Sequence, residues 1–157
     1  MFDIIEHKVH KGHKVKCATI EYLLPLSGMR DELIVCKEST IKQVLNAAFE
    51  IHNEFGSGML ESVYERALIW EMENRGFETQ RQVKVPVLYK GNELGPGFRA
   101  DIIVARSLLI EVKALKSLLD VHVSQVVTYL KLLKFKRGLL LNFGSPSMKD
   151  GIKRVAI

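Results

Sequence analysis

Two carboxylates and a lysine in the second half of the chain have the types and spacing that could support chemistry. Asp101 is followed ten positions later by Glu111, and Lys113 stands two residues further on. Alternate residues of a β-strand project to the same face, so Glu111 and Lys113 are expected side by side, with Val112 facing a core. The question is whether the fold brings Asp101 to the same patch.

A hairpin would do so. Two apolar runs around these residues are separated by three residues that are predicted to form a loop. If they do, Val104 pairs with Leu108, and the same register places Asp101 opposite Glu111. The predicted first strand, loop and second strand are residues 98–104, 105–107 and 108–112.

Two carboxylates on an otherwise apolar hairpin repel each other and lose hydration unless a cation pairs with them. Hard oxygen ligands suit Mg²⁺ or Mn²⁺, and the neighbouring Lys113 could orient or deprotonate an attacking water. The alternative is an ordinary edge strand with a Lys–Glu surface pair. The spacing alone leaves both interpretations open.

A helix predicted from Asp120 to Leu133 adds a polar stripe. His122, Gln125 and Tyr129 lie at i, i+3 and i+7, next to the apolar stripe that includes Val126 and Leu130. Such a helix could line a cleft beside the carboxylates. The alternative is a set of boundary residues with their polar tips in water.

Other periodicities predict the elements that must position these residues. A capping box formed by Thr40 and Gln43 starts a helix that ends near Gly56, and a second helix follows from Met59 to Arg75. Alternating or continuous apolar runs predict further strands. They cover residues 83–89, 138–142 and 152–157. This order implies an α/β protein with a mixed sheet covered by helices on both faces.

Composition and charge limit the class of protein. The chain has 157 residues, is 47% apolar and 26% charged, and carries a net charge of +5, which suits one globular domain. Residues 1–40 are neutral, so the positive excess belongs to the rest and favours a polyanionic partner. Basic residues near the end of the Asp120 helix are either phosphate contacts or helix-capping cations. They are Lys131, Lys134, Lys136 and Arg137.

The amino-terminal third carries few interpretable signals. Cys17 and Cys36 lack the number and spacing of a disulfide framework or a zinc site, which favours a reducing, cytoplasmic compartment. We recognise no targeting segment, and no run of about 20 apolar residues that could span a membrane. Three histidines near Cys17 match no metal-ligand spacing, and we interpret them as solvated residues of an extended segment. They are His7, His10 and His13.

Together, these residues resemble the PD-(D/E)XK nuclease superfamily, in the branch with a Gln-x-x-x-Tyr helix after the Glu-x-Lys strand. The matching residues are Asp101, Glu111, Lys113, Gln125 and Tyr129, with Ala100 in place of the name-giving proline. Within that superfamily the sequence Gly58-x-x-Glu61-x-x-Tyr64 is similar to the GxxExxY proteins. The surrounding residues that share this resemblance are Glu50, Ile51, His52, Gly56, Arg99, His122 and Leu141–Gly144.

The resemblance implies a three-layer α/β/α domain over residues 38–157, with a central mixed sheet of about four strands. Residues 1–37 have no counterpart and are treated as an extension of unknown role. Related nucleases complete the metal site with an acidic residue on the first helical segment, which corresponds to Glu61. A carboxylate there also gains from the helix dipole. Tyr64 is expected in the core, while Glu50, His52 and His122 are accessory candidates.

The function that follows is metal-dependent hydrolysis of phosphodiester bonds, with DNA the first candidate substrate and RNA the second. Asp101, Glu111 and Glu61 would bind Mg²⁺ or Mn²⁺, and Lys113, Gln125 and Tyr129 would complete the catalytic set. Lys131, Lys134 and Arg137 would contact nucleic acid. The alternative is a non-catalytic module that binds nucleic acid or protein. The oligomeric state, including a homo-oligomer, is left open.

Overall fold

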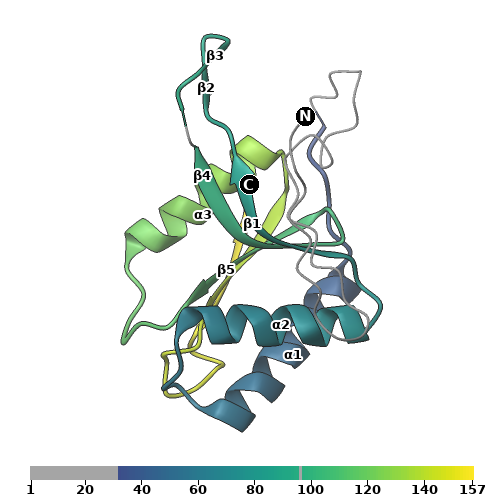
Figure 1. Cartoon of the computed structure of the whole chain (residues 1–157), viewed down its shortest axis with the longest axis vertical. Helices are drawn as coiled ribbons and strands as arrows, with labels where there is room; N and C mark the ends of the chain where they lie inside the picture. The colour runs from purple at the N-terminus through teal and green to yellow at the C-terminus, as the bar shows by residue number, and fades with distance from the viewer. Residues whose placement is uncertain (1–31, 96) are drawn as a thin grey trace, which may run out of the picture.

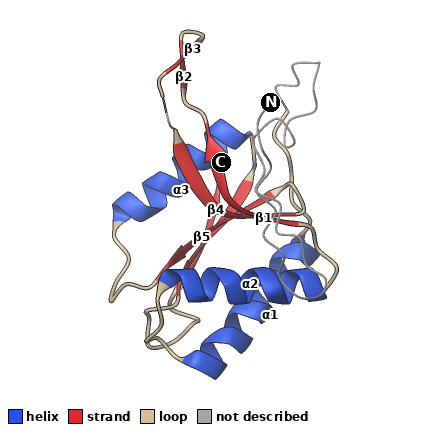
Figure 2. Cartoon of the chain, in the orientation of Figure 1, coloured by secondary structure: helices blue, strands red, loops and turns tan. Residues whose placement is uncertain are grey.

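The computed structural model of the chain describes residues 32–95 and 97–157, so the histidines at positions 7, 10 and 13 and Cys17 lie outside the described residues. The described part contains three helices and seven strands, two strands more than predicted, because the strand expected over residues 83–89 ends at Val85 and a small hairpin follows it (Figures 1 and 2). The helices are α1 (Glu38–Phe55), α2 (Glu61–Asn74) and α3 (Asp120–Leu133). The strands are β1 (Thr79–Val85), β2 (Leu88–Tyr89), β3 (Asn92–Glu93), β4 (Phe98–Val104), β5 (Leu108–Lys113), β6 (Arg137–Asn142) and β7 (Ile152–Ala156).

Five of the strands form one mixed sheet in the order β1-β4-β5-β6-β7. Of the neighbouring strand pairs in this sheet, only β5 and β6 are parallel. Helix α3 connects them and returns the chain to the edge of the sheet where β5 began, so β6 runs in the same direction as β5. The expected sheet of about four strands therefore has five, since β7 pairs with β6 along the far edge. β2 and β3 form a separate small hairpin.

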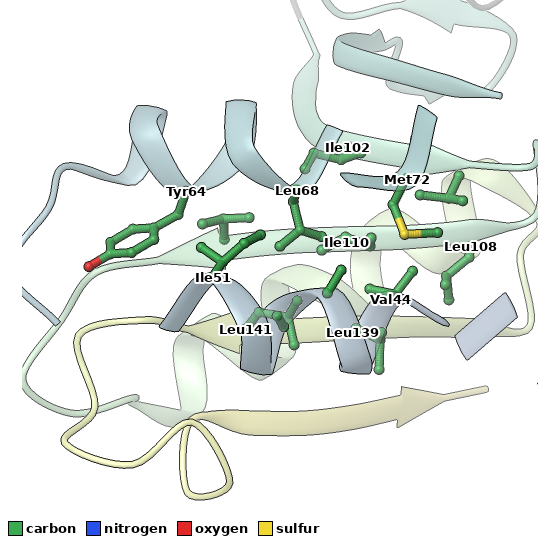
Figure 3. Close-up of a cluster of buried hydrophobic side chains, with 14 of the residues drawn as sticks. Val44, Ile51, Tyr64, Leu68, Met72, Ile102, Leu108, Ile110, Leu139 and Leu141 are labelled. Carbon is green, nitrogen blue, oxygen red and sulfur yellow. The ribbon is translucent and has the colours of Figure 1, made fainter. Parts of the chain in front are cut away.

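Helices α1 and α2 cover one face of the sheet, and α3 covers the other (Figure 2). The first core consists of apolar residues from α1 and α2 packed on the β4, β5 and β6 side chains of that face. Figure 3 shows this layer, with Leu68 of α2 above Ile110 of β5 and with Leu141 of β6 near α1. The predicted three-layer architecture is thereby confirmed.

Helix α3 approaches the sheet closely because β6 has a glycine beneath it. A Cβ at Gly138 would lie 3.1 Å from Val126 Cγ1 and 3.2 Å from Leu130 Cδ2. Val126 and Leu130 are fully buried, as the apolar stripe predicted, whereas Val123 and Val127 are partly buried. The close contact sets the height of the α3 polar stripe above the sheet.

The predicted start of α1 is wrong. The helix begins at Glu38 after Lys37, and no side chain caps it. Thr40 is buried in the first turn instead of forming a capping box with Gln43, because the backbone already turns at Lys37, whose carbonyl accepts the Thr40 N–H. Residues before α1 also join the domain, since Ile34 bridges Phe135 near the start of β6.

Tyr64 fixes the connection between α1 and α2. Its hydroxyl donates to the Gly56 carbonyl at 2.6 Å and accepts from the Met59 N–H at 3.0 Å. Its fully buried ring stacks on Phe143 with centroids 4.4 Å apart. The expected core tyrosine is therefore confirmed, and it holds the loop that leads into Glu61.

We predict that Tyr64→Phe lowers the free energy of unfolding by about 1–2 kcal/mol, because the ring packing remains while two hydrogen bonds to the loop are lost. Urea unfolding followed by circular dichroism measures this change. The control is Tyr89→Phe, at an exposed tyrosine. Equal stability of Tyr64→Phe and wild type would show that the hydroxyl does not hold the loop.

Candidate active site

The carboxylate cluster lies where β4 separates from β5. The predicted hairpin register is confirmed for Val104 with Leu108 and for the next two pairs, but the ladder ends at Ile102 and Ile110. One step further, the Val112 N–H donates to Asp101 Oδ2 at 3.0 Å. Asp101 is therefore not the ladder partner of Glu111 as expected. The Asp101 carboxylate accepts the hydrogen bond that a backbone carbonyl of β4 would accept in a regular ladder.

The ladder between β1 and β4 is interrupted at the same place. Arg81 pairs with Ile102 and Val83 with Ala100, while Gln82 between them has φ 53° and does not pair. A glutamine in this left-handed region carries strain of about 1–2 kcal/mol. The side chain explains why the strain is tolerated. Gln82 Nε2 donates to Asp101 Oδ1 at 3.2 Å.

Glu111 is the most deeply buried acid of the cluster, with 2% of its surface exposed. Its Oε1 accepts from Lys113 Nζ at 2.7 Å, whereas its Oε2 is buried without a hydrogen-bond partner. Burial raises the pKa of Glu111 to about 7; the charge of Asp101 adds to this, the bond to Lys113 opposes it, and the charge of Glu61 raises it further. Burial also raises the pKa of Asp101.

Lys113 is held in its charged form. Burial alone would lower its pKa, but the hydrogen bond and charge of Glu111, with the charges of Asp101 and Glu61, raise it above the usual value. A lysine of this kind is a poor base at neutral pH. Of the two roles predicted for Lys113, orientation of a water or phosphate agrees with this environment and deprotonation does not.

Glu61 begins α2 and reaches the end of β5. Its Oε1 accepts from the Ala114 N–H at 3.2 Å, and its charge acts on both Glu111 and Lys113. The resemblance predicted Glu61 as a third metal ligand. Within the described residues, no three His, Cys, Asp or Glu side chains are grouped so that they could hold a metal ion. Glu61 is bonded to the backbone at the end of β5, and its role as a third metal ligand stays a prediction.

Sequence reasoning missed a second glutamate on α2. Glu65 is 6% exposed and accepts hydrogen bonds from Arg81 Nε and Gln82 Nε2, both at 2.9 Å. Its charge raises the pKa of Asp101, after burial and against the bond from Val112. The available signal was its position four residues after Glu61, which places both carboxylates on one face of the helix.

From α3, Gln125 and Tyr129 come near the carboxylates. Gln125 Nε2 donates to the Tyr129 hydroxyl at 2.9 Å, and the buried Tyr129 ring lies 5.1 Å from that of Phe98. Burial raises the pKa of Tyr129, the bond from Gln125 opposes this, and the charges of Glu111 and Asp101 add to the increase. The predicted proximity of this part of the stripe to the carboxylate pair agrees with that electrostatic contact.

His122 contacts the backbone at the start of α3, and its accessory role at the site stays a prediction. Its Nδ1 accepts from the Leu119 N–H at 3.0 Å, so it caps the start of α3.

The structure also gives structural roles to Glu50 and His52. Glu50 is an exposed acid that pairs with Arg75 at 2.7 Å and links α1 to α2. His52 Nε2 donates to the Ser145 carbonyl at 2.9 Å and holds the loop after β6. These contacts do not test the accessory roles that the resemblance suggested for Glu50 and His52, which stay predictions.

The predicted nucleic-acid contacts lie away from Lys113. β5 and β6 are parallel, with Leu108 beside Arg137 and Lys113 beside Asn142, so Arg137 is at the opposite end of the strand pair. Arg137 donates to Glu38 at 2.8 Å. Lys131 is exposed in the last turn of α3, and Lys134 follows at its carboxyl end. Their distance from the cluster separates any phosphate contact there from the chemistry.

Comparison with known proteins identifies the family. A family model for the PD-(D/E)XK nuclease superfamily matches residues 38–155. The chain belongs to the PD-(D/E)XK nuclease superfamily. The finer resemblance to GxxExxY proteins stays a prediction. A solved structure titled "Crystal structure of SSO0001" is similar at 20% identity and a TM-score of 0.46, over 87% of this chain and 71% of that one. No curated protein shows significant similarity.

In this superfamily member, Asp101 and Glu111 supply two oxygen donors of the kind that suits a divalent cation, although no third such side chain joins them within the described residues. Glu111 Oε2 is a buried carboxylate oxygen without a hydrogen-bond partner, and the neighbouring Asp101 carboxylate is close enough for its charge to raise the pKa of Glu111. Oxygen ligands with negative charge are those that Mg²⁺ and Mn²⁺ prefer. A cation would also relieve the repulsion that raises the pKa of Glu111.

The raised pKa of Glu111 predicts a pH effect on stability without metal. The ordinary value is 4.5 and the folded value about 7, so the folded chain holds this proton more tightly and loses stability as pH rises between them. Glutamine does not titrate. The free energy of unfolding of Glu111→Gln, taken relative to that of wild type at the same pH, should therefore increase by up to about 3 kcal/mol between pH 4.5 and pH 8.

Urea unfolding in a chelator at several pH values measures this difference. Glu54→Gln, at an exposed residue of α1, is the control and should follow wild type throughout. A difference between wild type and Glu111→Gln that does not change with pH would contradict the raised pKa.

Proposed function

We propose that the chain is a metal-dependent nuclease that hydrolyses phosphodiester bonds in DNA. The observation that carries the proposal is the buried Glu111, whose second carboxylate oxygen has no hydrogen-bond partner beside Asp101 and Lys113. A purely structural strand gains nothing from a buried acid left half-satisfied. Membership of a nuclease superfamily supports the same activity.

Asp101 and Glu111 would hold Mg²⁺ or Mn²⁺, with Glu61 assisting directly or through a water. The bound ion would supply charge neutralisation at the phosphate and a more acidic water. The chain's own residues set the geometry around that position. Val112 and Gln82 orient the two oxygens of Asp101, and Lys113 orients one oxygen of Glu111.

Lys113 remains an ammonium and orients the water or a phosphate oxygen, as its raised pKa favours. Gln125 Nε2 donates to the Tyr129 hydroxyl oxygen. The hydroxyl can therefore donate its own proton to a bound phosphate oxygen or to an acceptor near Lys113. The aromatic contact with Phe98 fixes the Tyr129 ring and therefore the direction of that proton. These residues position reactants and stabilise charge.

A non-catalytic module that binds nucleic acid or protein is the second candidate. The observation in its favour is that Asp101, Glu61 and one oxygen of Glu111 already have donors within the protein. Uptake of a cation must therefore compete with these bonds. A metal titration separates the candidates, because a binding module has no need of Mg²⁺ or Mn²⁺.

The partner we propose is DNA, with RNA as the alternative, and the cell compartment is the cytoplasm. Cys36 is a buried free thiol, which agrees with a reducing environment. No helix of the described residues is long and apolar enough to cross a membrane. Assembly into a homo-oligomer stays an open prediction.

The test of the nuclease proposal uses the purified full chain with Mg²⁺ or Mn²⁺ on single-stranded, duplex and branched DNA and on RNA. Wild type should cleave, and Asp101→Asn and Glu111→Gln should each lose at least roughly a hundredfold in rate, because each removes a ligand charge. Affinity for DNA in a chelator should stay similar or rise in Glu111→Gln, since repulsion of phosphate falls.

Matched controls are Asp150→Asn and Glu54→Gln, which change exposed acids outside the cluster and should cleave as wild type does. Undiminished cleavage by Glu111→Gln would refute the assigned site. Absence of cleavage by wild type on every substrate, with salt-sensitive binding retained, would favour the binding module.

Gln82 should act as a positioning residue for Asp101. Gln82→Leu keeps the approximate volume but removes the amide that bridges Asp101 and Glu65. We expect Mn²⁺ affinity, measured by calorimetry, to fall about 10–100-fold, as for other residues that orient metal ligands. Gln43→Leu, at an exposed glutamine of α1, should leave it unchanged. Equal affinity in wild type and Gln82→Leu would show that the bridge is not needed.

A further inference from the structure

The β2–β3 hairpin projects from the body of the molecule, away from α1 and α2 (Figure 1). We define the ribbon as residues 86–95, between β1 and β4. Its strands pair at Leu88 with Glu93 and at Tyr89 with Asn92, and the Leu94 N–H donates to the Val87 carbonyl at 3.0 Å. Lys90 and Gly91 close the turn with φ 49° and 81°. This turn type suits the twist of a hairpin.

The ribbon exposes apolar side chains that no described residue covers. Leu88, Tyr89 and Leu94 are 63%, 58% and 63% exposed. An apolar patch on an element that contributes nothing to either core indicates a surface for binding. An isolated two-stranded hairpin is at best marginally stable in water, so these exposed side chains do not serve the stability of the hairpin itself.

The charge of the ribbon and its base is positive. Within the ribbon Lys90 and Glu93 balance each other, and the positive excess comes from two exposed basic residues at its base, Lys84 of β1 and Arg99 of β4, which pair across the two strands. Lys90 Nζ lies 5.4 Å from the centroid of the Tyr89 ring, so cation and aromatic face share the tip. This combination complements a phosphate backbone with base edges beside it.

The base of the ribbon is continuous with the carboxylate cluster. Gly97 passes so close to the Val85 carbonyl that a Cβ there would overlap it, which fixes the two arms against each other. Phe98 then contacts Tyr129 of α3, and Asp101 follows three residues later on β4. A polymer lying on the ribbon would therefore extend toward the cluster.

We propose that the ribbon enters the major groove of duplex DNA and places the strand to be cut at the cluster. This proposal rests on the proposed nuclease function, because that function requires the bound strand to run from the ribbon to the carboxylate cluster. A two-stranded ribbon fits a groove about 12 Å wide, where apolar side chains can contact thymine methyl groups. The deep, narrow major groove of duplex RNA excludes it. The substrate form is thus double-stranded B-form DNA.

The experiment measures binding of the full chain to a 30-base-pair DNA duplex, the matching RNA duplex and single-stranded DNA, by fluorescence anisotropy in a chelator. The variants are Leu88→Ser with Leu94→Ser, Tyr89→Ala, and Lys90→Ala. The first two should weaken binding to duplex DNA roughly fivefold or more, with little change for the other two ligands. Lys90→Ala should reduce the salt slope by about one phosphate contact.

Matched controls change exposed residues on other elements. Trp70→Ala is 60% exposed on α2 and Lys149→Ala is exposed in the loop before β7, and both should bind as wild type does. Thermal unfolding should be unchanged in the ribbon variants, because the ribbon packs on neither core. A large loss of thermal stability in them would mean that the ribbon is a structural element and would overturn the proposal.

The proposal is also overturned if wild type does not bind duplex DNA, if ribbon variants bind it unchanged, or if they lose affinity equally for all three ligands. Analytical sedimentation tests whether the ribbon instead binds a second copy of the chain. A wild-type dimer that becomes a monomer in the ribbon variants would assign the ribbon to a second copy of the chain. Failure of the nuclease proposal is distinguishable, since it gives no cleavage with metal while ribbon-dependent duplex binding persists.

Discussion

The hydrogen bond from the Val112 N–H to the Asp101 carboxylate is the interaction on which the site depends. A buried N–H at the middle of a sheet must find an acceptor, and leaving it without one costs about 1–3 kcal/mol. Asp101 Oδ2 supplies the acceptor at 3.0 Å, so residues of β4 before Ile102 can separate from β5 without leaving the Val112 N–H unpaired. The opening that results is where charged groups can enter an otherwise apolar sheet.

That opening gathers more negative charge than the protein neutralises. Arg81 and Gln82 satisfy Glu65, the Ala114 N–H satisfies one oxygen of Glu61, and Lys113 satisfies one oxygen of Glu111. Glu111 Oε2 is left over, and the pKa of Glu111 rises to about 7 because burial and the charge of Asp101 disfavour its ionised form. Such unfavourable packing persists where function requires it.

Local patterns in the sequence predicted the parts of the fold that depend on local forces. Periodicity placed α3 at Asp120–Leu133 and β4 at Phe98–Val104, and the three-residue loop set the hairpin register. Where the register stops could not be predicted, because it depends on Asp101 competing with a backbone carbonyl. Glu65 was missed for a related reason. Its partners become visible only once Gln82 adopts a positive φ and α2 docks against β1.

The interruption of both ladders at Asp101 also explains how residues from opposite layers reach one point. A regular strand directs alternate side chains to opposite faces of the sheet, so α2 and α3 would each contact different side chains of the same strand. At Asp101, the carboxylate is linked through Gln82 to Glu65 of α2, while its charge acts on Tyr129 of α3. Asp101 is therefore linked by hydrogen bonds to the α2 side and lies within electrostatic reach of Tyr129 on the α3 side.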